Sequence, residues 1–277
     1  MTRAPASIYE LRRENGPENK RQSSGCDRFK PGIGKAAAEA LAAEGVNLAS
    51  CSRDETAIKR TADAIKEKYN VEVLAEACDV TEPSSIEDFK GKVIHHFSTC
   101  HILFTNAGGP PPGKVEQFSE TDFREALNLN LLSTINLVNA FLPFMKQQKW
   151  GRILASTSIS VKQPIPTLAL SNVSRAGVVA FIKSLSREIA FLNVTANTLA
   201  PGYIMTERVK NLLDNQAKTQ GITHEEAKAN LIDTIPAKKI ALPEDFGALC
   251  AFLSSGWASY ITGETILIDG GMYQGLM

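Results

Sequence analysis

Two short motifs near the start of the chain have the residue types that bind a dinucleotide. Gly32-Ile33-Gly34 opens a stretch that favours a helix. Glycines there let the backbone approach a pyrophosphate, and the helix N-terminus supplies N–H donors and a partial positive charge. Ser52-Arg53 follows one helix and one strand later. A carboxylate at that point would hold a ribose 2′-hydroxyl, whereas arginine favours a 2′-phosphate. The motifs therefore favour NADP(H), with NAD(H) second, and a solvated Arg53 in a turn is the structural alternative.

Helices and strands must position these motifs, and helical and strand-like patterns alternate from about residue 32 onward. Helices are expected at 36–43, 55–69, 84–97, 121–145, 175–191 and 243–254, and strands at 46–51, 71–77, 101–105, 151–156, 194–199 and 265–269. Strand–helix repetition with short connections implies right-handed crossovers. The sequence therefore predicts an α/β fold, a single Rossmann-type doubly wound parallel sheet with helices on both faces. We expect one domain over 32–277.

Composition excludes several function classes. The 277 residues hold 30 Lys+Arg against 30 Asp+Glu, so a nucleic-acid groove or a polybasic membrane patch is not expected. The apolar stretch 127–145 is interrupted by asparagines and a proline, which argues against a membrane span. Five widely spaced cysteines are typical of reduced thiols in a cytoplasmic protein. His95, His96, Cys100 and His101 lack the spacing of metal ligands, and no metal is expected.

Residues 1–31 do not fit the pattern. The stretch 12–22 is charged and aperiodic and has no strand-forming run, although a doubly wound fold needs a strand just before its phosphate loop. A disordered tail is one interpretation. The second hypothesis is a wrong-frame translation. Allowed codons for Ser24 to Pro31, read one base later, encode Val-Val-Val-Thr-Gly-Ser-Ser-Arg, a hydrophobic strand that leads into Gly32.

A resemblance to a known family rests on several motifs in the expected order over residues 32–277. They are Asn106-Ala107-Gly108 after one predicted strand, Asn130 in the long helix, Ser158 after the next strand, Pro201-Gly202, and the C-terminal Ile261-Thr262-Gly263 and Asp269-Gly270-Gly271. Together they are similar to the short-chain dehydrogenase/reductases, in the branch of 3-oxoacyl-carrier-protein reductases and glucose dehydrogenases. The resemblance implies hydride transfer between a nicotinamide and a carbonyl or alcohol, in a homodimer or homotetramer.

The same resemblance implies roles for single residues. Ser158 would hydrogen-bond the substrate oxygen, and Asn130 would anchor a proton-relay water. The remaining roles concern the cofactor: Asp79 and Val80 would line the adenine, Asn106, Ala107 and Gly108 would flank the adenosine ribose, and Pro201, Gly202, Ile204 and Thr206 would wall the nicotinamide.

The family's Tyr-x-x-x-Lys pair is replaced here by Ser171 and Arg175. The i, i+4 spacing keeps both side chains on one helix face. Arg175 can hold a positive charge beside ribose hydroxyls but cannot release a proton at working pH, and a serine is a poor direct acid. Three outcomes stay open: a water held by Ser171 donates the proton, Tyr203 donates it, or the protein binds NADP(H) without turnover. The first two give an atypical oxidoreductase. A scaffold that uses the long helix for oligomerisation is the third functional class.

Residues 206–240 are polar, helical in pattern and long for a connection. In this fold such an insertion lies above the carboxyl ends of the strands, where a substrate enters, so it is a candidate lid. Val209, Leu212, Leu213 and Ala217 recur at helical spacing. They form either an apolar wall for the substrate or the inner face of a helical hairpin that caps the sheet.

Overall fold

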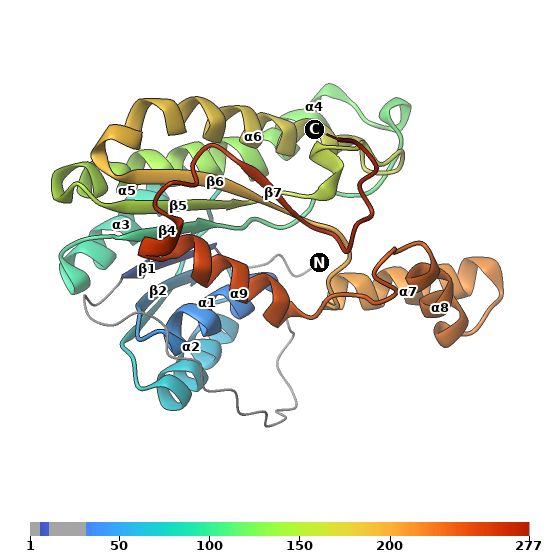
Figure 1. The fold of residues 1–277 in the computed structure, drawn as a ribbon, viewed down its shortest axis with the longest axis horizontal. Coiled ribbons are helices and arrows are strands. Elements are labelled where there is room, and N and C mark those ends of the chain that lie inside the picture. Colours follow the sequence, from blue (N-terminus) through green and yellow to red (C-terminus); the bar gives the residue numbers. More distant parts are fainter. Residues whose placement is uncertain (1–5, 11–31, 277) are drawn as a thin grey trace.

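The computed structural model describes residues 6–10 and 32–276. A seven-stranded sheet runs through the molecule in the order β3-β2-β1-β4-β5-β6-β7 (Figure 1). Its strands are β1 (Ala6–Glu10), β2 (Asn47–Ser52), β3 (Val73–Ala77), β4 (Ile102–Thr105), β5 (Gly151–Ser156), β6 (Val194–Pro201) and β7 (Thr265–Ile268). This strand order confirms the predicted doubly wound α/β fold.

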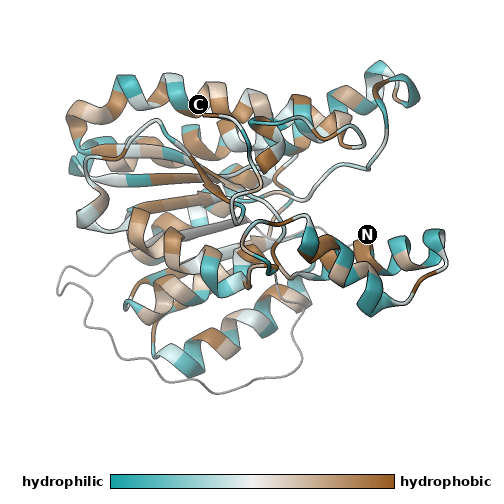
Figure 2. Cartoon of the chain, turned by 45° about the vertical axis from the view of Figure 1, so that its right-hand side comes forward, coloured by the Kyte–Doolittle hydropathy of each residue, from teal (hydrophilic) through white to brown (hydrophobic). Residues whose placement is uncertain are grey.

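Helices cover both faces of the sheet (Figure 1). They are α1 (Ile33–Ala43), α2 (Glu55–Tyr69), α3 (Pro83–Phe97), α4 (Glu120–Leu127), α5 (Ser133–Gln148), α6 (Ala169–Ile189), α7 (Glu207–Gln220), α8 (His224–Asp233) and α9 (Pro243–Ser254). One core cluster packs α3, α5 and α6 against the sheet, and the other packs α1 and α9. Apolar residues gather on the strands and on the helix faces turned toward them (Figure 2).

The central strand β1 differs from the expected all-parallel sheet. It pairs antiparallel with both β2 and β4, whereas the other neighbouring strands are parallel. The sequence analysis recognised no strand in 1–31, and this was wrong for Ala6–Glu10. The facing edges of β2 and β4 are buried, with Leu48 and Ile102 fully shielded from water, so their backbone groups need a partner in this slot. The residues of the wrong-frame hypothesis, 24–31, lie outside the described residues.

Two helices differ in detail from their predicted form. The helix expected at 121–145 is interrupted by a π-helical turn at Asn128–Leu132, which separates α4 from α5. Helix α6 begins at Ala169 instead of Arg175 and ends at Ile189. Its first turns contain serine and asparagine, which have low helix propensity and hid the true start.

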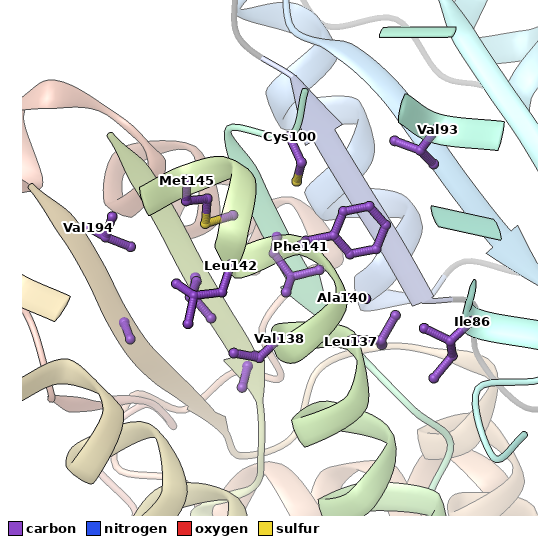
Figure 3. Packing of buried hydrophobic residues seen from close by; sticks show 14 of the residues in the cluster. Ile86, Val93, Cys100, Leu137, Val138, Ala140, Phe141, Leu142, Met145 and Val194 are labelled. Carbon is purple, nitrogen blue, oxygen red and sulfur yellow. The ribbon is translucent and has the colours of Figure 1, made fainter. Parts of the chain in front are cut away.

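One stretch, Glu120–Gln148, is long and apolar enough to cross a membrane by length and composition alone. In the fold half of its most apolar window is buried inside the protein. Leu137, Phe141 and Met145 are buried in the core between α5 and the sheet (Figure 3). This stretch is therefore a core helix, in agreement with the sequence analysis.

Candidate active site

The predicted site residues converge on one edge of the sheet. The chain order reverses across β1, with β2 and β3 on one side and β4 to β7 on the other. In doubly wound sheets, ligands bind at such a reversal, in the crevice outside the carboxyl ends of the strands. Ser52, Asn106, Ser158 and Pro201 stand at or just after the carboxyl ends of β2, β4, β5 and β6. The fold therefore brings together residues that are far apart in sequence.

The glycine motif opens α1 at this edge. Gly32 is the N-cap residue, with extended backbone, and Ile33 and Gly34 form the first turn. The Gly32 carbonyl accepts the first helical hydrogen bond from the Ala36 N–H, at 3.1 Å. Gly32 offers no side chain to cap this helix, and within the described part of the chain the N–H groups of its first turn can meet an anionic ligand.

Ser52, Arg53, Asp79 and Val80 lie together at the ends of β2 and β3. Arg53 Nη1 stands 3.8 Å from Asp79 Oδ2, and the Arg53 side chain keeps 46% of its surface exposed. Thr81 donates its backbone N–H and its hydroxyl to Asp79 Oδ1 and fixes that carboxylate. An exposed ion pair of this kind contributes little stability, so Arg53 can turn from Asp79 to a phosphate at small cost.

The loop after β4 carries a buried polar side chain without a partner. Asn106 is 4% exposed, and its Nδ2 has no hydrogen-bond acceptor within the part of the chain that the structure describes. The next two residues accept bonds through their carbonyls: Ala107 from Arg175 at 3.5 Å and Gly108 from Asn130 at 3.0 Å. An unsatisfied buried donor is costly, and a ligand acceptor in the crevice would satisfy it.

Asn130 is held at both ends of its amide. Its Nδ2 donates to the Gly108 carbonyl, and its Oδ1 accepts from Ser174 Oγ at 3.1 Å. It lies in the π-helical turn between α4 and α5, where Thr134 Oγ1 donates to its backbone carbonyl at 2.8 Å. π-Turns occur frequently at functional sites because they displace one residue from the helical register.

Arg175 is a buried cation surrounded by carbonyl oxygens. Its Nη1 donates to the carbonyls of Ser156 at 2.9 Å and Thr157 at 3.2 Å, so it joins α6 to the end of β5. Burial, followed by the nearby positive charge of Arg208, lowers the pKa of Arg175 to about 10. The guanidinium therefore remains charged at neutral pH and cannot act as an acid.

Both catalytic serine candidates are close to this cation along the chain, one directly after Thr157 and the other one turn before Arg175 on α6. Ser158 follows β5 directly after Thr157, and its Oγ accepts the N–H of Ser160 at 3.1 Å. Ser171 is 3% exposed and shares the buried face of α6 with Ser174 and Arg175. Both hydroxyls keep the ability to donate a proton in a hydrogen bond.

The predicted nicotinamide wall follows β6. Gly202 donates its N–H to the Ile268 carbonyl at 3.0 Å, and a Cβ at Gly202 would come 3.0 Å from Asp269 Cα, so the two strand ends touch here. Pro201 ends β6, Ile204 is buried and Thr206 is the N-cap residue of α7. These residues form a continuous border between β6 and the α7–α8 segment.

The segment predicted as a lid has its own small core. Val209 and Leu213 of α7 pack against Ala227 and Leu231 of α8, with Ile235 beside them. Leu213 is fully buried there. The apolar stripe of α7 is thus used to hold the hairpin together, and the hairpin stands beside the sheet edge (Figure 1).

Tyr203 belongs to this same cluster of the hairpin. It lines a pocket with Ile235, Ala241 and Asp269, and Ser158 is not among the residues of that pocket. Burial raises the pKa of the Tyr203 phenol, which makes it a weaker acid. Because its pocket does not include Ser158, Tyr203 is the less well placed of the two candidate proton donors.

Two residues at the crevice were missed by the sequence analysis. Ser174, which orients Asn130, lies three residues after Ser171, and that spacing could have placed it on the same helix face. Arg208 in the first turn of α7 lies against Gly109 of the β4 loop. No local pattern signals that contact. Over the described ranges, no three or more His, Cys, Asp or Glu side chains are grouped as metal ligands.

Comparison with known proteins adds to this geometry. Residues 29–273 match a family model described as enoyl-(acyl carrier protein) reductase. The 3-oxoacyl-[acyl-carrier-protein] reductase FabG of Vibrio cholerae is 33% identical over 242 residues, which cover 87% of this chain and 93% of the relative. The chain belongs to the short-chain dehydrogenase/reductase family. It is accordingly an NAD(P)-dependent oxidoreductase of the short-chain type.

Further relatives of this short-chain dehydrogenase/reductase differ in substrate. The D-beta-hydroxybutyrate dehydrogenase of Rhizobium meliloti is 31% identical over 244 residues, covering 87% of this chain and 94% of the relative. Among solved structures, the L-sorbose reductase of Gluconobacter frateurii, in complex with NADPH and L-sorbose, is similar with a TM-score of 0.85 and 28% identity. The alignment covers 89% of this chain and 94% of that one. YwfH, an NADPH-dependent reductase of bacilysin biosynthesis, has a TM-score of 0.84 at 28% identity, covering 88% and 95%.

Proposed function

We propose that this protein is an NADP(H)-dependent oxidoreductase that interconverts a small carbonyl compound and the corresponding secondary alcohol. The observation that carries the proposal is the linked group of Asn130, Ser174 and Arg175 beside Ser158 at the carboxyl edge of the sheet. The residues present suit the cofactor: an uncapped helix start at Gly32, the unsatisfied Nδ2 of Asn106, and a movable Arg53.

With a nicotinamide held in the crevice, its chemistry would be hydride donation to the carbonyl carbon, and the protein would have to bring one proton from solvent to the carbonyl oxygen to complete the alcohol. Ser158 Oγ donates a hydrogen bond to that oxygen and stabilises its developing negative charge. Arg175 keeps a fixed positive charge next to the same position. Ser171, on the Arg175 face of α6, holds the water that delivers the proton, and Asn130 orients the polar chain behind it.

A second candidate function is NADP(H) binding without turnover. It is favoured by the substitution of the tyrosine and lysine of the family pattern by Ser171 and Arg175, because neither replacement releases a proton at neutral pH. Mixing NADPH, protein and a panel of ketones and aldehydes separates the two functions. Loss of the near-ultraviolet absorbance of NADPH supports the oxidoreductase. Saturable NADPH binding without any loss of absorbance supports a protein that binds the cofactor without turnover.

The variant Ser171→Tyr tests whether the proton donor acts at the position of Ser171. Ser171 is buried on the face of α6 that bears Arg175, so a tyrosine there would extend toward the reacting oxygen and replace the water. We expect a higher kcat with an unchanged dissociation constant for NADPH. An unchanged kcat in a folded variant would place the proton donor elsewhere.

We further propose a cytoplasmic homo-oligomer, a dimer or tetramer. The side chains of Cys51, Cys78, Cys100 and Cys250 are all buried, which fits reduced cysteines in a reducing compartment. Three large apolar side chains near the end of α9 are exposed: Phe252, Trp257 and Tyr260. Such a grouping favours a protein–protein contact. Light scattering of the purified protein gives the mass of the assembly directly.

A further inference from the structure

Two arginines approach each other at the mouth of the crevice. The guanidinium of Arg208, from the first turn of α7, lies directly over Gly109, since a Cβ built on Gly109 would overlap it. Arg175 lies below the same loop, with Nη2 3.5 Å from the Ala107 carbonyl. The positive charge of Arg208 acts on Arg175. The β4 loop thus contacts two cations, one contributed by α6 and one by α7.

Neither cation has a carboxylate partner among the ion pairs of the described residues. Arginines elsewhere do: Arg53 faces Asp79, and Arg124 of α4 binds Glu120. Arg175 donates only to neutral carbonyls. Arg208 makes no hydrogen bond with any residue of 6–10 or 32–276. Arg208 also stands at a helix N-terminus, where the helix dipole disfavours a positive charge. Within the described ranges, no carboxylate neutralises the positive charge at this point.

Arg208 places this positive charge on the solvent side of the crevice. Its side chain is solvent-exposed, and it comes from the hairpin that borders the substrate entrance, after the nicotinamide wall that ends at Thr206. The loop it touches leads through Gly113, whose N–H donates to the Thr167 carbonyl at 2.7 Å, to the start of α6. Arg208 is therefore exposed to solvent beside the crevice, whereas Arg175 is buried beside it.

We propose that Arg208, supported by the charge of Arg175, binds the anionic group of the substrate, a carboxylate or phosphate carried on the carbonyl compound. A guanidinium fork recognises either group through paired hydrogen bonds. This inference rests on the proposed function for the carbonyl part of the substrate, and it selects anionic over neutral carbonyl compounds. The cofactor also carries phosphates, so the experiment must separate the two sources of the anion.

The test uses acetoacetate and its neutral methyl ester with the full chain and the variants Arg208→Gln and Lys210→Gln. Lys210 is an exposed cation on the same helix and controls for the general loss of charge. With NADPH, Arg208→Gln should lower kcat/KM for acetoacetate about 10- to 100-fold and leave that for the ester within about twofold. Lys210→Gln should change neither. Circular dichroism verifies that each variant is folded.

Calorimetric titration of acetoacetate and of the ester, with and without NADP+, keeps the inference separate from turnover. Tighter binding of acetoacetate that is lost in Arg208→Gln supports the inference even if neither compound is reduced, a result that would instead count against the proposed function. Equal binding of both compounds, or no binding of acetoacetate, overturns it. A weaker affinity of Arg208→Gln for NADPH, with unchanged acetoacetate binding, also overturns it and assigns Arg208 to the cofactor phosphates.

Discussion

The hydroxyl of Ser174 stands 3.1 Å from Asn130 Oδ1 and 2.7 Å from the Leu170 carbonyl, so its one proton is shared between these acceptors and connects α6 with the π-helical turn that binds the β4 loop. Both side chains are buried, at 0% and 3% exposure. Asn130 would otherwise have an unsatisfied amide oxygen inside the protein. The pair therefore fixes an amide that links the loop of Gly108 to the buried face of α6.

Replacing Ser174 by alanine removes this support. We expect the free energy of unfolding to fall by about 1–2 kcal/mol, because Asn130 Oδ1 loses its partner in a buried site. We also expect a lower kcat. The matched control is Ser184→Ala, further along α6, whose hydroxyl bonds the Ala180 carbonyl at an exposed position. Urea denaturation of both variants checks the difference, and equal losses would show that Ser174 has no special role.

Ser158 and Ser171 are expected to contribute to the chemical step more than to cofactor binding. Ser158→Ala should lower kcat about 100-fold, because it removes a hydrogen-bond donor to the developing oxyanion. Ser171→Ala should lower kcat about tenfold, since a water remains but loses its anchor. The dissociation constant for NADPH, measured by fluorescence, should stay the same in both variants. A weaker affinity with normal kcat would refute these roles.

The charge of Arg175 should make cofactor binding independent of pH over the working range. Its pKa of about 10 leaves it protonated below that pH, and the charge is lost only as the pH rises through that value. In Arg175→Lys, the same burial would lower the lysine pKa well below its usual value, toward the working pH range. NADPH affinity of this variant should fall as the pH rises from about 7 to 9, while that of the unsubstituted protein stays level. A level profile for both proteins contradicts this interpretation.

Arg53 is expected to discriminate between the two nicotinamide cofactors. Arg53→Ala should weaken NADPH binding about 10- to 100-fold by removing the cation that meets the 2′-phosphate, and should leave NADH binding within about twofold. Arg124→Ala, which also removes an exposed arginine from an ion pair with a carboxylate, is the control outside the crevice. If NADPH and NADH binding weaken equally, Arg53 does not contact the 2′-phosphate.

Hydrophobic periodicity located the helices and strands whose formation depends mainly on the local sequence. Helix α2, strand β5 and helix α9 begin and end at the predicted residues 55–69, 151–156 and 243–254. Strand β1 was missed because a five-residue strand has a weak signal, and its pairing with β2 and β4 joins residues far apart in the sequence. The π-helical turn was also missed, since one residue displaced from the register leaves the apolar pattern of the helix nearly unchanged.

The candidate site residues also divide into those that local patterns locate and those that depend on long-range packing. The resemblance supplied Ser158 and Asn130 because each stands at a fixed place after a strand or inside a helix. Arg208 could not be found that way, because its contact with Gly109 depends on where the α7–α8 hairpin is placed. The apolar stripe of α7 likewise left two interpretations, and only the packing of Leu213 against α8 shows that it serves the hairpin's own core.

The wrong-frame hypothesis for residues 1–31 gives a separate prediction. Replacing Ser24–Pro31 by Val-Val-Val-Thr-Gly-Ser-Ser-Arg supplies a hydrophobic strand and a glycine turn directly before Gly32. We expect a tighter complex with NADPH and a higher unfolding temperature, because the more apolar strand would replace Ala6–Glu10 between β2 and β4 and lead directly into the glycine turn. An unbroken reading frame on resequencing the gene, together with an unchanged affinity, would remove the hypothesis.

The central claim is that the crevice over the sheet holds a phosphorylated nicotinamide nucleotide with its reactive ring next to Ser158. Titration of NADPH into the chain, in its present form and with the repaired segment, tests this claim most directly. We predict saturable binding, tighter for NADPH than for NADH, that protects Ser158 and the β6 end from hydrogen exchange. The absence of saturable NADPH binding in both proteins, or protection confined to a distant surface, would contradict it.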